Sequence, residues 1–168
     1  MYDYVVMLLF EEIGAEMIRY LKDGLKAQGV KSREKAWPPH ITVDLYKGIE
    51  IKELLAMIDA YVKELRAFPV YIRRMADFHG KVLYLSFDNE PELQEIKERF
   101  DELLAAYRLV VNKRDIYTPH ATLAINRDIE TARKLLADVF VPFRGRIAYL
   151  AVYSRDMQLL KKYRLSDS

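Results

Sequence analysis

The spacing of apolar residues changes between two periods along the chain, and each change marks a new element. Residues 5–10 form an apolar run of strand length. Apolar residues then recur every four positions from Ile13 to Leu25, which is the spacing of one helix face, and Gly29 is a natural helix stop. This part of the chain therefore predicts a strand followed by a helix.

The same two periods predict the remaining elements. β-rich or alternating runs predict strands at 38–46, 70–78, 82–87, 119–125 and 146–155, and helical spacing predicts helices at 51–65, 91–107 and 131–140. Phe68-Pro69 is expected to close the second helix, and His79-Gly80 to form a tight turn between two strands. The predicted order is βαβα followed by ββαβαβ.

Two short segments on predicted strands match each other. Pro39-His40-Ile41-Thr42 and Pro119-His120-Ala121-Thr122 share one pattern, lie 80 residues apart and contain two of the chain's three histidines. Each lies between two predicted helices, which indicates a duplicated unit. The predicted fold class is therefore α+β, with two pseudo-symmetric lobes whose antiparallel sheets line a central cleft and whose helices lie outside.

Strand geometry predicts which side chains each motif presents. Side chains two positions apart on a strand point to the same face, so His40 stands beside Thr42, and His120 beside Thr122. Along the first strand the same alternation assigns Ile41, Val43 and Leu45 to the core, and Asp44 and Tyr46 to the face of the histidine. Each strand thus offers an imidazole and a hydroxyl to one surface.

Paired imidazoles and hydroxyls suit a phosphodiester substrate. Imidazole has an unperturbed pKa of about 6.5, so near neutral pH one histidine can act as base and the other as acid. The hydroxyls can donate hydrogen bonds to non-bridging oxygens. We expect the catalytic residues to be His40, Thr42, His120 and Thr122, acting without a metal or other cofactor on a 2′,3′-cyclic phosphate of an RNA end or a nucleotide. In the reverse direction the same groups would join RNA ends by a 2′,5′ bond.

The sequence allows three other interpretations of the motifs. A two-histidine metal site would have to recruit Asp44 or other carboxylates, because the chain has no cysteine and His79 is most simply a turn residue. The cleft could instead bind RNA or a nucleotide without turnover. A phosphoesterase acting on a small nucleotide-derived cyclic phosphate is the third alternative.

Three residues outside the motifs are candidates for substrate binding. Trp37 lies just before the first motif in a basic loop, where it could stack on a base or anchor the loop. Tyr84 and Arg155 lie on alternating strands, so they could reach the cleft as a stacking wall and a phosphate clamp. A packing role is the alternative for the tyrosine.

Composition restricts the class of protein. The 168 residues, 51% of them hydrophobic, suffice for a single domain of two interlocked lobes spanning residues 1–168. The net charge of +2 is small, but local basic clusters suit a polyanionic partner, and no obligate protein partner is evident. The first apolar run meets Glu11-Glu12 at once and predicts a strand rather than a signal peptide, and no apolar stretch has membrane-spanning length. Together with the absence of cysteine, these features predict a cytoplasmic location.

The two motifs also carry a family resemblance. His40-Ile41-Thr42-Val43, followed by Tyr46-Lys47-Gly48, and His120-Ala121-Thr122-Leu123 resemble the paired motifs of the 2H phosphoesterase superfamily, in particular its branch of 2′-5′ RNA ligases and RNA cyclic phosphodiesterases. The likeness spans nearly the whole chain. It implies two pseudo-symmetric α+β lobes around a cleft and a metal-independent reaction carried out by the paired motifs.

Overall fold

The computed structural model describes residues 1–87, 90–109 and 117–167. In chain order its elements are β1 (Tyr4–Phe10), α1 (Glu12–Ala27), β2 (His40–Tyr46), α2 (Ile51–Val62), β3 (Phe68–Phe78), β4 (Val82–Phe87), α3 (Pro91–Leu104), a 3-10 turn η1 (Ala105–Tyr107), β5 (His120–Ile125), α4 (Glu130–Ala137), β6 (Phe143–Ser154) and β7 (Leu159–Arg164). None of these helices is long and apolar enough to cross a membrane.

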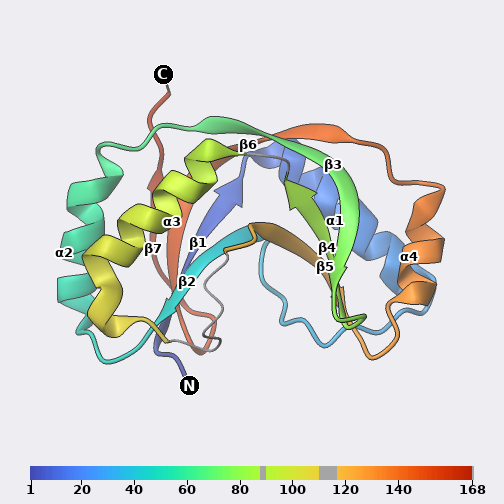
Figure 1. Cartoon of the computed structure of the whole chain (residues 1–168), viewed down its shortest axis with the longest axis horizontal. Helices are drawn as coiled ribbons and strands as arrows, with labels where there is room; N and C mark the ends of the chain where they lie inside the picture. The colour runs from blue at the N-terminus through green and yellow to red at the C-terminus, as the bar shows by residue number, and fades with distance from the viewer. Residues whose placement is uncertain (88–89, 110–116, 168) are drawn as a thin grey trace.

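The described strands form one antiparallel sheet of seven strands. Its order is β2-β1-β6-β3-β4-β5, and β7 pairs with β6 outside this path. From either end the order is a motif strand, the strand before the helix that leads to that motif, and a long strand. The two long strands arch across the molecule in Figure 1 and pair with each other through Phe68–Ile72 and Phe143–Ile147. The predicted α+β class with two related halves is confirmed, while the expected separate sheets are joined into one.

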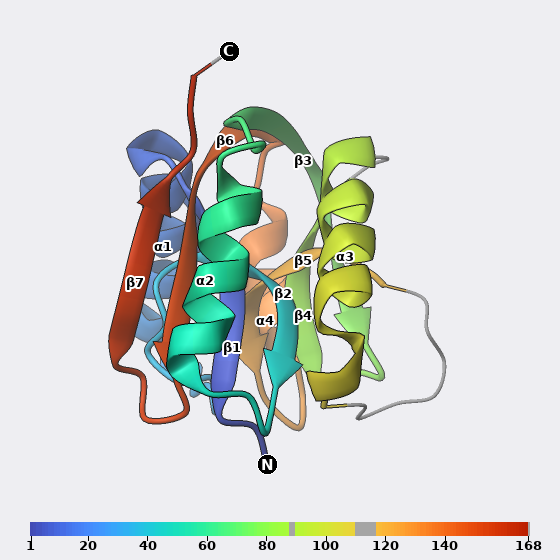
Figure 2. The same ribbon diagram turned by 90° about the vertical axis from the view of Figure 1, so that its left-hand side faces the viewer.

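The helices cover the sheet in an exchanged arrangement. α1 follows β1 and contacts β1 and β6, but it also packs against β5 and α4, and α3 follows β4 but packs against β2. Figures 1 and 2 show α2 and α3 together on one side of the molecule, with α1 and α4 on the other. Each half of the chain therefore contributes one helix to the other half.

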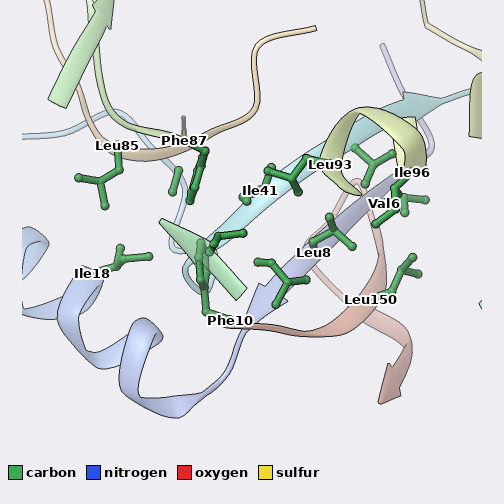
Figure 3. Packing of buried hydrophobic residues seen from close by; sticks show 14 of the residues in the cluster. Val6, Leu8, Phe10, Ile18, Ile41, Leu85, Phe87, Leu93, Ile96 and Leu150 are labelled. Atoms are coloured by element: carbon green, nitrogen blue, oxygen red, sulfur yellow. The ribbon is translucent and has the colours of Figure 1, made fainter. Parts of the chain in front are cut away.

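The hydrophobic core follows this exchange. Figure 3 shows Leu93 and Ile96 of α3 packed over Val6 and Ile41 of the first two strands, while Ile18 of α1 points towards β4. The rings of Phe10 and Phe87 stack with their centroids 6.1 Å apart and connect the two groups. One continuous buried cluster thus supports both motif strands.

Two expected boundaries were wrong and one strand was missed, all for one reason. Phe68-Pro69 begins β3 rather than closing α2, which ends at Val62, and β6 begins at Phe143, before the predicted start. β7 was not predicted. Each of these segments is extended because it pairs with β6 or, in the case of β6 itself, with β3. Such long-range pairing leaves little trace in local periodicity, and the β7 sequence LLKKYR does not alternate between apolar and polar residues.

The predicted hairpin between β3 and β4 is confirmed. His79 and Gly80 have φ angles of 53° and 68°, the left-handed conformation that a tight two-residue turn requires. The Lys81 N–H donates to the Phe78 carbonyl at 3.0 Å and closes the turn. His79 is therefore a turn residue, as expected.

Candidate active site

The two motif strands are far apart in sheet order but adjacent in space. β2 and β5 are the outermost strands on the main path of the sheet, yet they contact each other because the sheet curves strongly. Figure 1 shows them meeting at the centre of the molecule. A hydrogen bond of 2.7 Å from the Tyr117 hydroxyl to the Thr42 carbonyl ties the segment before the second motif to the first motif. The structure thus brings together the two motifs that share a sequence pattern.

Both histidines are held in the same way. The Nδ1 atom of His40 lies 2.8 Å from the carbonyl oxygen of Pro38, and that of His120 lies 2.8 Å from the carbonyl oxygen of Thr118. A carbonyl oxygen can only accept, so Nδ1 must carry the proton in each ring. The neutral form of each imidazole then keeps its lone pair on Nε2, the atom left to exchange a proton with a ligand.

The pKa values of both imidazoles are shifted in the same direction. Burial, together with smaller effects of the positive charges of Lys22 and His120, lowers the pKa of His40 to about 4, against the opposing effect of the Pro38 carbonyl. Burial also lowers the pKa of His120, again opposed by its carbonyl partner. That the charge of one histidine acts on the other follows from their proximity. Both rings therefore favour the neutral state in the free protein, His40 strongly so.

The cross-strand partners of the motifs define the face that carries the chemistry. His40 and Thr42 stand opposite Leu9 and Met7 of β1. In the second half, His120 and Thr122 stand opposite Ser86 and Tyr84 of β4. Because directly opposed residues share a face, imidazole and hydroxyl lie side by side in each half, as the alternation predicted.

The predicted alternation fails beyond the threonines. Consecutive residues of β1 pair with Thr42 and Asp44 of β2, which leaves Val43 as an extra residue. The same shift between β4 and β5 leaves Leu123 extra between Thr122 and Ala124. A bulge of this kind inserts one residue and reverses the faces that follow. The assignments of Leu45, Asp44 and Tyr46 were therefore wrong: Leu45 packs with Val5 on the face of the histidine, and Tyr46 is fully buried in the main core.

Asp44 is held by cations beside α3. Its carboxylate accepts hydrogen bonds from Lys97 Nζ and, at 2.7 Å, from Arg108 Nε. Lys97 also bonds Asp101 at 2.7 Å, and its side chain is only 9% exposed. Asp44 thus lies on the face of the sheet that α3 covers, opposite to the face that carries His40. In the described part of the chain, no three His, Asp or Glu residues gather as a metal-binding group.

Aromatic side chains contact both histidine rings. Trp37 lies edge-on to His40 with centroids 6.3 Å apart and edge-on to Tyr153 at 5.2 Å. On the other side, Tyr84 contacts His120 at 5.3 Å and stacks on Phe78 at 4.2 Å. Trp37 and Tyr84, both predicted from sequence, therefore lie at the site.

Some neighbours of the site were not predicted from sequence, and one predicted residue lies elsewhere. Phe78 and Tyr153 follow from the register of β3 and β6, which the sequence does not reveal. Arg74 stands opposite Ser86, which in turn stands opposite His120, and its positive charge acts on the Tyr84 hydroxyl. Arg155 lies in the turn after β6, where its guanidinium contacts the Met1 sulfur at 3.0 Å. Its part in substrate binding stays a prediction.

The amino-acid sequence matches a known protein family. A family model described as the 2′-5′ RNA ligase superfamily matches residues 11–158. The chain belongs to this superfamily. Its members are 2H phosphoesterases acting on RNA or nucleotides, which supports an enzyme of the phosphoesterase or ligase type. The predicted resemblance is confirmed.

Solved structures share the fold along nearly the whole chain at low identity. TT0787 of Thermus thermophilus has 14% identity and a TM-score of 0.68, with 99% of each chain covered. LigT of E. coli complexed with 3′-AMP has 14% identity and a TM-score of 0.66, with 99% of this chain and 98% of LigT covered. No curated protein matches the sequence at a significant level. The structural relatives therefore support the superfamily fold.

Proposed function

We propose that the protein is a metal-independent phosphodiesterase that opens 2′,3′-cyclic phosphate ends of RNA or nucleotides. The observation that carries this proposal is the pair of equivalent histidines, each with Nδ1 on a backbone carbonyl 2.8 Å away and with Nε2 left for proton transfer. Membership in the 2′-5′ RNA ligase superfamily supports the substrate class. LigT, which shares the fold, has been crystallised with 3′-AMP and with phosphate.

We assign the role of base to His40 and that of acid to His120. A base must be neutral before the reaction, and His40 has a pKa of about 4. Nε2 of His40 would take a proton from water as the water oxygen bonds to phosphorus. The bond from phosphorus to one ribose oxygen breaks, and that oxygen receives the proton from Nε2 of protonated His120. The product is a ribose phosphomonoester, with no change in oxidation state.

Thr42 and Thr122 would hold the phosphate. Each hydroxyl stands next to an imidazole on the same strand face and can donate to a non-bridging oxygen. Charge develops on these oxygens in the transition state, where preorganised donors contribute most. Trp37 and Tyr84 would flank the nucleoside, since each contacts one of the histidine rings. If a 5′-hydroxyl replaced water, the same proton transfers would form a 2′,5′ linkage.

Turnover of defined substrates tests the proposal. Adenosine 2′,3′-cyclic phosphate and an RNA ending in a cyclic phosphate are incubated with the protein in EDTA, and products are separated by chromatography. We expect a phosphomonoester from the wild type and a loss of about 10²–10⁴-fold in His40→Ala and His120→Ala. His79→Asn, at the positive-φ turn, is the matched control and should keep full activity. Full activity in either alanine variant would contradict the proposal, and RNA binding without any product would favour a non-catalytic module.

A further inference from the structure

The end of each motif strand is bonded by the segment that precedes the opposite motif. In the first half, the carbonyl oxygen of Leu45 in β2 accepts a hydrogen bond of 2.9 Å from the N–H of Leu109. In the second half, the carbonyl oxygen of Ile125 in β5 accepts a bond of 2.8 Å from the N–H of Arg33. Leu45 and Ile125 each stand five residues after the histidine of their motif, so the two bonds are equivalent.

In the first half, main-chain atoms complete this contact. The N–H of Lys47 donates to the carbonyl oxygen of Tyr107 at 2.8 Å, and Tyr46 and Arg108 between these bonds form an antiparallel β-bridge. Almost any residue type can supply such groups, because every residue except proline carries both an N–H and a carbonyl. The contact at the end of β2 therefore depends little on the identity of the side chains.

In the second half, side chains complete the equivalent contact. The side-chain amide of Asn126 donates to the carbonyl oxygen of Lys31 at 2.7 Å. The hydroxyl of Ser32 accepts from the N–H of Ile125 at 3.0 Å. The attachment of this loop to the end of β5 therefore depends on two particular side chains, those of Ser32 and Asn126.

Further bonds fix both of these residues. The Ser32 hydroxyl also accepts from the N–H of Glu34 at 3.2 Å, and the Glu34 carboxylate forms an ion pair with Lys22 of α1. The main-chain N–H of Asn126 donates at 2.9 Å to the carbonyl oxygen of Lys81, which lies in the turn between β3 and β4. Ser32 and Asn126 thus connect the loop and the end of β5 to two fixed elements of the fold.

The same loop leads directly into the first motif and orients its histidine. The Trp37 ring lies edge-on to the His40 ring, and the carbonyl oxygen of Pro38 lies 2.8 Å from Nδ1 of His40. One loop therefore holds His40 at its end and, through Ser32, holds the strand that carries His120. A displacement of this loop from β5 would change how the two imidazoles face each other.

We propose that Ser32 and Asn126 are positioning residues, which fix the distance between the two motifs by bonding the loop before His40 to the end of β5. The inference rests on the proposed function, whose acid, base and phosphate-binding groups it leaves unchanged. Both motifs must contact one phosphate, so a small displacement between them weakens phosphate binding and slows the reaction.

Ser32→Ala tests this inference, with Ser32→Thr and Ser154→Ala as controls. Ser32→Ala removes the acceptor of the Ile125 N–H, whereas Ser32→Thr keeps a hydroxyl. Ser154→Ala removes a bond of the same kind from the turn between β6 and β7, where the Ser154 hydroxyl accepts from the N–H of Gln158 at 3.1 Å. Amide hydrogen exchange at Ile125 should become faster in Ser32→Ala and stay at the wild-type rate in Ser154→Ala.

Two measurements report the relative position of the motifs. In Ser32→Ala, kcat/KM for adenosine 2′,3′-cyclic phosphate should fall about tenfold. The affinity for inorganic phosphate, measured by isothermal titration calorimetry, should fall about fivefold, which is the effect of about one hydrogen bond. Both values should be close to wild type in Ser32→Thr and in Ser154→Ala. Asn126→Asp, which turns the donor to the Lys31 carbonyl into an acceptor, should lower both values as Ser32→Ala does.

Stability and turnover separate the possible outcomes. The urea midpoints of Ser32→Ala and Ser154→Ala should be similar, because each variant loses one exposed hydrogen bond. Wild-type kcat/KM and phosphate affinity in Ser32→Ala, despite faster exchange at Ile125, would overturn the positioning role while the phosphodiesterase proposal stands. Without turnover in any variant or the wild type, the phosphodiesterase proposal fails. A phosphate affinity that falls in Ser32→Ala and recovers in Ser32→Thr would then still support the positioning role.

Discussion

The Tyr117 hydroxyl donates a hydrogen bond of 2.7 Å to the carbonyl oxygen of Thr42. Tyr117 lies just before the second motif and Thr42 within the first, so this bond joins segments from opposite halves of the chain. β2 and β5 are not hydrogen-bonded neighbours in the sheet. The relative position of the two histidines therefore depends on direct contacts between the two motif segments, such as this hydrogen bond.

Tyr117→Phe should reduce catalysis more than stability. The variant loses one hydrogen bond, worth about 1 kcal/mol of unfolding free energy, while the ring keeps its packing. Small displacements between catalytic groups lower the rate strongly, so we expect kcat to fall about tenfold with little change in KM. Steady-state kinetics and urea unfolding measure the two effects. Tyr107→Phe, whose hydroxyl lies 3.5 Å from Glu53 at an exposed site, is the matched control. Equal kcat in Tyr117→Phe and wild type would rule out this coupling.

The pKa shifts predict an activity maximum on the acidic side of neutrality. His40 as base must be neutral, so kcat/KM should fall as the pH drops through about 4. His120 as acid must be protonated, so kcat/KM should fall as the pH rises through its pKa, which burial lowers from 6.5. A pH series of kcat/KM for a cyclic mononucleotide gives both limbs. The alkaline limb should disappear from the residual activity of His120→Ala, and a wild-type maximum above pH 7 would contradict the assignment.

Tyr84→Ala should shift the alkaline limb of the pH profile of kcat/KM. The Tyr84 ring covers His120 and is itself 7% exposed, so its removal admits water to the imidazole. Burial is the main cause of the lowered pKa of His120, and hydration should raise this pKa towards 6.5. We expect the alkaline limb to shift to higher pH, with a loss of stability of about 3 kcal/mol from the cavity. Tyr84→Phe keeps the ring and should keep the wild-type profile. If the alkaline limb of Tyr84→Ala stays at the wild-type pH, burial of His120 by the Tyr84 ring is not the cause of its lowered pKa.

The placement of the paired motifs on strands could be predicted from sequence because it rests on local pattern. The two His-x-Thr segments are visible as repeated residues, and strand geometry assigns each histidine and its threonine to one face. The bulges after Thr42 and Thr122 could not be predicted, since they depend on which residues of β1 and β4 stand opposite. Phe78, Tyr153 and Arg74 reach the site through sheet register, which no local period encodes.

The bulge after Thr42 also changes the role of Asp44. Simple alternation assigned its carboxylate to the face of His40 and made it a candidate metal ligand. In the structure it accepts bonds from Lys97 and Arg108 beside α3. The pairing of β1 with β2 beyond the bulge, rather than the residue type, decides which role the carboxylate has.

Asp44→Asn should therefore affect stability rather than chemistry. Asp44→Asn removes one of the two carboxylates that pair with the largely buried Lys97 and leaves it Asp101, which should cost about 3 kcal/mol of unfolding free energy. Urea denaturation measures this loss, and kcat/KM at a temperature where the variant is folded should stay within about twofold of wild type. Glu102→Gln, which removes an exposed ion pair with Arg99, should change stability by less than about 1 kcal/mol. A kcat/KM reduced a hundredfold in folded Asp44→Asn would show that this carboxylate takes part in the reaction.

The exchange of α1 and α3 between the halves has a consequence for how the protein loses its structure. Neither half buries its sheet with its own helices alone, since α1 packs against β5 and α3 against β2. Detaching either helix uncovers a motif strand that belongs to the opposite half, so partial opening on one side disturbs the other. Amide hydrogen exchange should accordingly show both motif strands becoming accessible in one shared opening event, and no intermediate with a single intact His-x-Thr strand should accumulate.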